Sequence, residues 1–364
     1  DAKYTWDRGK IISALAAMSQ SINTEATAAY AEPVTDWSQE ERFIYHAGEE
    51  GITLNEEATA DAIEKALEQG EFVCTVEATV NAVLPGGNID DLKAATSFIA
   101  SYTTKFSARR DDEVKQNRKF NIQKAADIIN GNTIQPGEEW SFNTVVGPRT
   151  YELGWKGANG ISGGKEYTIQ AGGGICQVST TLYNALLCAN MEIVDRRAHT
   201  IPSDYVPVGL DATVDTRGID FVWKNNTDMP SYIFAKVENV EGSSSRHTIT
   251  VYVYGKPLPE GVTYQSRNEI IEERSRQDEA IYTNDASIPT GYQLERVQGH
   301  KYYVAEAYQD KYVDGKLAES KLLYTDKYKG NPPEVSIGTG APLASGQTPD
   351  PAWKPYGTPL EDAN

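Results

Sequence analysis

Several features are scarce in this sequence. Three of its 364 residues are cysteines, and this odd number excludes a complete disulfide framework and leaves at least one thiol unpaired. The spacing Cys-x-x-Cys, which structural zinc sites favour, does not occur, so neither a metal nor a cofactor is expected. No run of 18 apolar residues occurs, so no segment is predicted to span a membrane.

Basic residues are also in short supply. The chain has 34 lysines and arginines against 52 aspartates and glutamates, which gives a net charge of −18. This balance argues against nucleic acid as a partner and favours a soluble, self-repelling surface. The sequence begins at Asp1 without a methionine or a signal peptide. We therefore expect that any membrane anchor belongs to an export segment absent from this chain.

The length exceeds what one hydrophobic core normally serves, so several domains are expected, with an α+β class for the whole. Residues 1–108 show two helical patterns and alternating strand-like runs, including a half-buried strand at 72–76. Residues 109–257 form a central α+β domain. Residues 258–340 contain short strands separated by turns, typical of a small all-β module. Residues 341–364 carry five prolines and are predicted to be a disordered tail.

The clearest chemical signal is a thiol behind three glycines. Gly172, Gly173 and Gly174 precede Ile175 and Cys176. A helical stripe follows, with apolar residues at offsets 0, 4, 7, 8 and 11 from Val178. Cys176 is therefore predicted at the first turn of a helix, where free N–H groups and the helix dipole lower the pKa of a thiol. The alternative is a buried structural cysteine, the role expected for Cys74 and Cys188.

A nucleophilic thiol needs a base, and the chain offers four histidines. His199 follows Cys176 by 23 residues, after the predicted helix and the strand-like run at 192–195. A returning strand can bring it back to the helix start, so His199 is the favoured partner. A surface histidine without a catalytic task remains the alternative.

The central segment, from Asn117 to about Tyr254, resembles the VanW domain. The matching motifs are Asn117-Arg118-Lys119-Phe120-Asn121-Ile122, Pro136-Gly137-Glu138, Trp140-Ser141-Phe142-Asn143, Val146-Gly147-Pro148-Arg149, the run from Gly172 to Ala185, Arg197-Ala198-His199-Thr200, Tyr205-Val206-Pro207, Asp211-Ala212-Thr213-Val214 and Lys224-Asn225-Asn226-Thr227. Thr200 departs from the serine usual in the family but keeps a hydroxyl. The segment 42–92 similarly resembles a peptidoglycan-binding domain, and 258–340 resembles the G-five domain of exported wall proteins.

The resemblance implies an extracellular protein of Gram-positive cell walls, membrane-anchored at full length. Its partners would be peptidoglycan stem peptides and glycan, and its activity a cysteine-dependent L,D-transpeptidase. Cys176 would be the nucleophile and His199 its partner, with Asp211 or Asp204 as the orienting acid. The expected oxyanion and substrate contacts are Gly173, Gly174, Gln177, Arg197 and Tyr205. The YkuD-type L,D-transpeptidases place histidine just before cysteine, an order absent here, so any shared chemistry would be convergent.

Two other functions fit the same residues. A non-catalytic wall-binding or scaffold protein would use the glycine loop for contact, with an incidental Cys176. A cysteine peptidase or amidase would form the same thioester but resolve it with water.

Overall fold

The computed structural model describes residues 4–162 and 166–362. The outermost residues of the predicted first domain and of the predicted tail lie outside these ranges. The chain forms two compact units, Asp1–Thr96 and Ser97–Asn364. Helices and strands mix in both, which confirms the α+β class. Among the described residues, no helix is both long enough and apolar enough to cross a membrane.

The first unit is a small helical and hairpin assembly. Its elements are α1 (Arg8–Ile22), β1 (Tyr30–Pro33), β2 (Phe43–His46), β3 (Gly51–Leu54), α2 (Glu56–Glu68), β4 (Val80–Val83) and α3 (Ile89–Ala95). Its core packs Leu15 of α1 against Leu54 and Ala60. The Asn55 side chain caps α2 by accepting a hydrogen bond from the N–H of Ala58 at 3.0 Å.

The predicted strand at 72–76 does not form. These residues have no regular structure, Cys74 is exposed, and Val73 is 99% exposed. The pairing edge of β3 is taken by β4 instead. Alternation of apolar side chains is not enough for a strand without a neighbouring strand to bond. The expectation of a buried Cys74 is therefore wrong.

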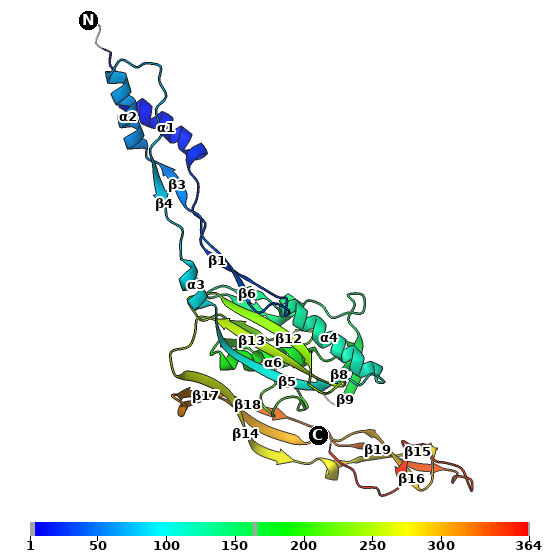
Figure 1. Ribbon diagram of the computed structural model, residues 1–364. Helices are drawn as coiled ribbons and strands as arrows, with labels where there is room; N and C mark the ends of the chain where they lie inside the picture. Colours follow the sequence, from blue (N-terminus) through cyan, green and yellow to red (C-terminus); the bar gives the residue numbers. More distant parts are fainter. Residues whose placement is uncertain (1–3, 163–165, 363–364) are drawn as a thin grey trace. The chain divides into compact units, whose positions relative to one another are not determined.

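The second unit is built on a four-stranded antiparallel sheet of order β5-β13-β12-β6. Its elements up to residue 255 are β5 (Ser97–Ser107), α4 (Glu113–Ile129), β6 (Asn132–Ile134), β7 (Glu139–Ser141), α5 (Phe142–Val146), β8 (Gly157–Ser162), β9 (Glu166–Ala171), α6 (Ile175–Cys188), β10 (Glu192–Asp195), β11 (Val222–Lys224), β12 (Ser231–Asn239) and β13 (Arg246–Gly255). Helices α4 and α6 pack on this sheet and on each other (Figure 1). The sequence predicts a first domain boundary after residue 108, but β5 pairs along β13, so residues 97–108 lie in the second unit.

Two further sheets make up the C-terminal part of the second unit. Their elements are β14 (Val262–Arg274), a short 3-10 helix (Gln277–Glu279), β15 (Ile281–Pro289), β16 (Tyr292–Val297), β17 (Tyr302–Val313), β18 (Lys316–Tyr328), β19 (Glu334–Gly340) and β20 (Lys354–Pro355). One sheet has the order β14-β17-β18 and the other β15-β19-β16-β20. Asp314 and Gly315 join β17 to β18 with positive φ angles of 50° and 73°, which is the geometry of a tight hairpin turn.

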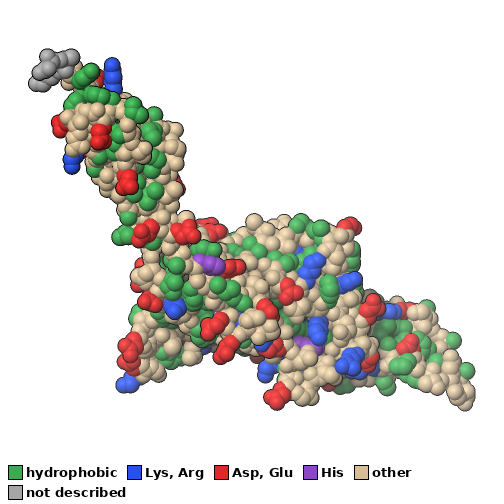
Figure 2. Space-filling view, turned by 45° about the horizontal axis from the view of Figure 1, so that its top comes forward, with side chains coloured by type: hydrophobic (Ala, Val, Ile, Leu, Met, Phe, Trp, Pro, Cys, Tyr) green, Lys and Arg blue, Asp and Glu red, His purple; other side chains and the backbone are tan. Residues whose placement is uncertain are grey.

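The tail is more ordered than its proline content predicts. Strand β20 pairs with β16, and the Trp353 ring lies 6.2 Å from that of Tyr292. The Gln293 amide donates to the Thr358 carbonyl at 2.9 Å. A proline at the edge of a sheet removes no hydrogen bond between strands, so a proline-rich segment can still pair there. Figure 2 shows carboxylates spread over the visible face with lysine and arginine side chains between them, in keeping with the negative net charge.

Candidate active site

Cys176 is the second residue of helix α6. The N-cap residue is Gly174, whose φ of 102° is left-handed, and no side chain caps the helix start. The Cys176 thiol is partly buried and donates to the carbonyl of Val214 at 3.3 Å. The helix N-terminus brings positive partial charge to the sulfur. The predicted position of this thiol in the first helical turn is confirmed.

The three glycines are required by the protein's own packing. Gly172 and Gly174 adopt φ angles of 78° and 102°, which L side chains rarely tolerate. A Cβ on Gly173 would lie 2.3 Å from the carbonyl oxygen of Ala158 in β8. Gly173 and Gly174 are predicted to contact a substrate, and the structure gives Gly173 a further reason to be glycine, since its turn packs directly against β8.

His199 lies in the loop after β10, directly against Asp211. The Asp211 carboxylate accepts hydrogen bonds from both the backbone N–H of His199, at 2.7 Å, and the ring Nδ1. Both side chains are buried, with Asp211 1% exposed. Asp204, the alternative acid, is exposed on the surface. The structure therefore brings Cys176, His199 and Asp211 together and leaves Asp204 apart.

Mutual contacts set the charges of this trio. Burial alone would lower the pKa of His199, but Asp211 and Cys176 raise it to about 10. Burial alone would raise the pKa of the Cys176 thiol, but the hydrogen bond and charge of His199, together with Arg149, bring it below its ordinary value. Asp211 also has a lowered pKa, because His199 and Arg196 outweigh its burial. Both shifts favour the charged pair, a Cys176 thiolate beside a His199 imidazolium that is held by the Asp211 carboxylate.

Arg149 is a second cation beside the sulfur. It is 8% exposed, and one Nη donates to Asn143 Oδ1 at 2.7 Å and to the Gly147 carbonyl at 3.2 Å. Within the described part of the chain, no carboxylate forms an ion pair with it. Burial lowers the pKa of Arg149, while the negative charge of Cys176 opposes this. A buried guanidinium with neutral partners can still receive an anion.

The predicted substrate contacts divide into two groups. Tyr205 lies beside Cys176, where burial and the charge of Cys176 raise the pKa of its phenol. The Gln177 side chain is fully occupied, accepting from Arg118 at 2.6 Å and donating to Thr104 Oγ1 at 2.8 Å. These bonds tie α6 to α4 and to β5. The Arg197 side chain is exposed, so the structure does not bring it into the cluster.

Backbone donors at the helix start are partly used. The Gln177 N–H donates to the Gly174 carbonyl at 3.1 Å, and the Gly173 N–H donates to Gln170 at 3.2 Å. No described residue accepts a hydrogen bond from the Cys176 N–H. The N–H of Gly174 likewise has no hydrogen-bond acceptor among residues 4–162 and 166–362. The N–H groups of Cys176 and Gly174 are therefore the remaining candidates for the predicted oxyanion hole.

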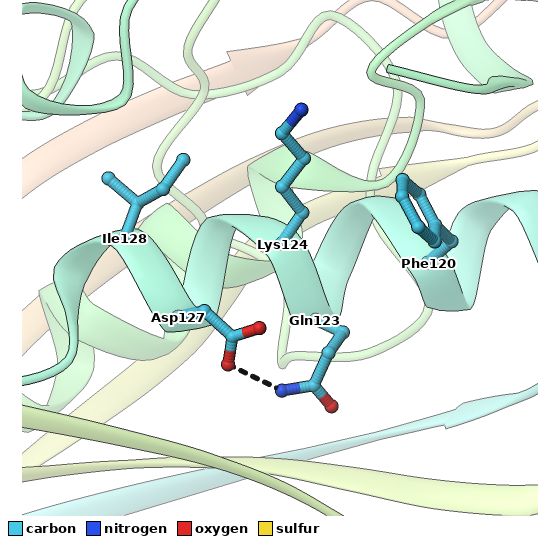
Figure 3. A pocket seen from close by; sticks show the side chains of 5 residues that line it. All are labelled: Phe120, Gln123, Lys124, Asp127 and Ile128. Atoms are coloured by element: carbon cyan, nitrogen blue, oxygen red, sulfur yellow. Dashed lines mark hydrogen bonds between the residues drawn. The ribbon is translucent and has the colours of Figure 1, made fainter. Parts of the chain in front are cut away.

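The remaining thiols and imidazoles lie elsewhere. Burial raises the pKa of Cys188, late in α6. His46 stacks on Tyr30, and His247 stacks on Phe106 at 5.3 Å between ring centroids. An open hollow of about 390 Å³ on the outer side of α4 is lined by Phe120, Gln123, Lys124, Asp127 and Ile128, none of which belongs to the Cys176 cluster (Figure 3).

Sequence reasoning missed two residues that contact the trio and a third that contacts one of these two. Arg196 is buried and bonds the backbone and the carboxylate of Asp211. Tyr328 donates to Asp211, and Asp326 pairs with Arg196. Arg196 directly precedes the matched Arg197 motif and could have been suspected. Tyr328 and Asp326 come from strand β18, and no motif links them to the site.

Comparisons with known proteins agree on the central segment. A family model described as VanW like protein matches residues 117–248. The uncharacterized protein YoaR of Bacillus subtilis is 42% identical over 142 residues, 39% of this chain and 45% of that protein. The vancomycin B-type resistance protein VanW of Enterococcus faecalis is 27% identical over 220 residues, 59% of this chain and 70% of that protein. Less than half of the YoaR length therefore has a counterpart here.

Two solved structures match part of this chain. A G5 domain of an IgA1 protease covers 22% of this chain and 93% of its own, at 16% identity and a TM-score of 0.16. The HP0197-G5 structure covers 21% of this chain and 97% of its own, at 24% identity and a TM-score of 0.13. Similarity at these TM-scores carries no argument about this chain.

Proposed function

Since residues 117–248 belong to the VanW-like family, we propose that this chain is an extracellular cell-wall protein that acts on peptidoglycan stem peptides as a cysteine L,D-transpeptidase. The observation that supports the proposal is the contact of Cys176 with His199 and of His199 with Asp211. A nucleophile, a base and an orienting acid in this order are the recurrent arrangement of acyl-transfer enzymes.

The reaction follows from the charges at the site. The Cys176 thiolate attacks the carbonyl of the third residue, a diamino acid, in a stem tetrapeptide. The amide bond to the terminal D-alanine breaks while His199 gives its proton to the leaving amine, and a thioester forms. The side-chain amine of a neighbouring stem then attacks the thioester and passes a proton to His199. The new amide cross-links two diamino acids, and the thiolate is released.

Arg149 supports a substrate that carries a carboxylate beside the scissile bond. Its guanidinium is buried, close enough to Cys176 for each charge to act on the other, and without a directly paired carboxylate in the described chain, although Asp215 and Asp220 act on it from farther away. The departing D-alanine has such a carboxylate one residue beyond the attacked carbonyl. Guanidinium groups bind carboxylates through paired N–H donors, which favours Arg149 as the anchor of the leaving residue.

The test is incubation of the full chain with tetrapeptide-bearing muropeptides, followed by mass spectrometry of protein and products. The proposal predicts a tripeptidyl adduct on Cys176 and then cross-linked dimers. Both are lost in Cys176→Ala and retained in Cys188→Ala, a matched control within the same helix.

Other outcomes select the alternatives. Free tripeptide without dimers identifies a peptidase that uses water as the acceptor. Muropeptide binding that persists in Cys176→Ala, with no adduct in the unmodified chain, identifies a wall-binding or scaffold protein.

A further inference from the structure

Strand β18 of the C-terminal part reaches into the Cys176 cluster. The Tyr328 side chain at its end is fully buried. Its hydroxyl donates to Asp211 Oδ1 and accepts from the N–H of Gly209 at 2.9 Å. Asp211 Oδ2 is the oxygen that receives His199. Tyr328 thus holds one carboxylate oxygen while His199 takes the other.

Asp326, two residues earlier on β18, acts on the same carboxylate through Arg196. The Arg196 side chain has no exposed surface. It donates to the Asp211 backbone carbonyl at 2.6 Å and approaches Asp211 Oδ1 at 3.3 Å, while its other Nη pairs with Asp326. Without Asp326, this buried guanidinium would have Asp211 as its one anionic partner in the cluster, in competition with His199.

Asp326 supplies one of the negative charges next to Arg196. The carboxylates paired with Arg196 are Asp211 and Asp326, and Asp211 also pairs with His199. Arg149 acts on Cys176 and is itself acted on by Asp215 and Asp220, while Arg118 acts on Tyr205. Burial raises the pKa values of the neighbouring phenols of Tyr183, Tyr205, Tyr324 and Tyr328. Because a buried guanidinium needs an anionic partner, loss of Asp326 should strengthen the pull of Arg196 on Asp211 and thereby lower the His199 pKa.

The sheet that carries these residues is fixed to the central domain. Ala307 of β17 packs with Val206 and Leu210 of the loop that leads to Asp211. The Gln309 amide donates to the Leu187 carbonyl of α6 at 2.8 Å. The Asn268 amide of β14 donates to the Val208 carbonyl at 2.9 Å. All three strands of the β14-β17-β18 sheet therefore contact the elements that position the reactive residues.

We infer that Tyr328 and Asp326 are positioning residues, which orient the Asp211 carboxylate toward His199, so that the C-terminal sheet is a structural part of the reactive centre. The catalytic meaning of this inference rests on the proposed function. Its test does not, because the charge state of His199 can be measured without substrate.

The experiment follows the His199 ring by NMR in the full chain with isotopically labelled histidine, using His199→Gln to identify the signal. In Asp326→Asn, and in Tyr328→Phe, the Asp211 carboxylate should turn toward Arg196. The His199 pKa should then fall from about 10 by about one unit, the effect expected for loss of one hydrogen bond to a charged group. Asp326→Glu should restore it.

Asp310→Asn is the matched control. Asp310 is a buried carboxylate of the same sheet, paired with Arg267 at 2.7 Å, with no bond to the cluster. The Asp310→Asn substitution should lower thermal stability without changing the His199 pKa. An unchanged His199 pKa in folded Tyr328→Phe and Asp326→Asn would overturn the inference. A shifted pKa in a chain that never reacts with muropeptides would reject the proposed function and leave the inference standing.

Discussion

Substitution of Asp211 by asparagine is the sharpest test of the electrostatic reasoning. The change keeps the size of the side chain and removes its charge, which both His199 and Arg196 contact. The His199 pKa of about 10 lies about 3.5 units above its ordinary value of 6.5. At 1.36 kcal/mol per unit this difference is worth about 5 kcal/mol. Without the carboxylate, burial opposes the charged imidazole and Cys176 is left as the group that favours it, so the His199 pKa should fall.

Loss of the imidazolium should lower the reactivity of the Cys176 thiol. An ordinary thiol with a pKa of about 8.5 is only about 3% thiolate at pH 7. Alkylation of Cys176 by iodoacetamide at pH 7 should therefore slow in Asp211→Asn, by up to about 30-fold where the thiolate fraction alone changes. Peptide mass spectrometry over a series of pH values measures the rate at this one residue. An unchanged rate and pH profile in a folded Asp211→Asn variant would refute the reasoning.

The same substitution should change how stability depends on pH. Because the folded pKa of His199 is raised, its stabilisation is complete below about pH 6.5 and is lost as the pH rises through about 10. Thermal melts of the unmodified chain should fall across that range, and those of Asp211→Asn should not. Asp204→Asn, at an exposed position, is the control. If Asp211→Asn fails to fold, His199→Gln supplies the same test with no buried cation left unpaired.

Three further predictions concern the surroundings of the thiol. Arg149→Lys should keep the rate of Cys176 alkylation within about threefold, because the charge remains. It should raise KM for tetrapeptide substrates far more than it lowers kcat. An equal loss of kcat/KM for substrates with and without a free carboxylate would reject Arg149 as the anchor. Gly173→Ala should lower the free energy of unfolding by about 2 to 4 kcal/mol, measured by urea denaturation, since the new methyl meets the Ala158 carbonyl at 2.3 Å. Cys176 should be alkylated faster than Cys188 at pH 7, because burial raises the pKa of Cys188; comparable rates would contradict a stabilised thiolate.

The sequence predicts the local half of the site well. The apolar stripe from Val178 and the glycines before Cys176 were enough to place the thiol at the start of α6. The single strand between α6 and His199 made the return to the helix start geometrically reasonable. Both signals are short-range, and periodicity and turn chemistry capture short-range order.

The other half of the site depends on contacts that have no local signal. Asp211 and Asp204 are equivalent as residue types, and only burial distinguishes the one that meets His199. Tyr328 belongs to a different predicted module. The predicted strand at 72–76 fails for a related reason. Its residues alternate as a strand should, but β4 occupies the edge of β3 and leaves it without a pairing strand. Tertiary pairing decides both cases.

The place of Tyr328 at the far end of β18 has a consequence for biosynthesis. From Cys176 the ribosome must add 152 further residues before Tyr328 exists, the difference between the two positions. Domains mature in the order in which they are translated. A nascent chain in which Cys176 has already been made still lacks β18, the strand whose Tyr328 bonds Asp211. A fragment cut at residue 248, where the family match ends, would lack Tyr328 and Asp326 permanently.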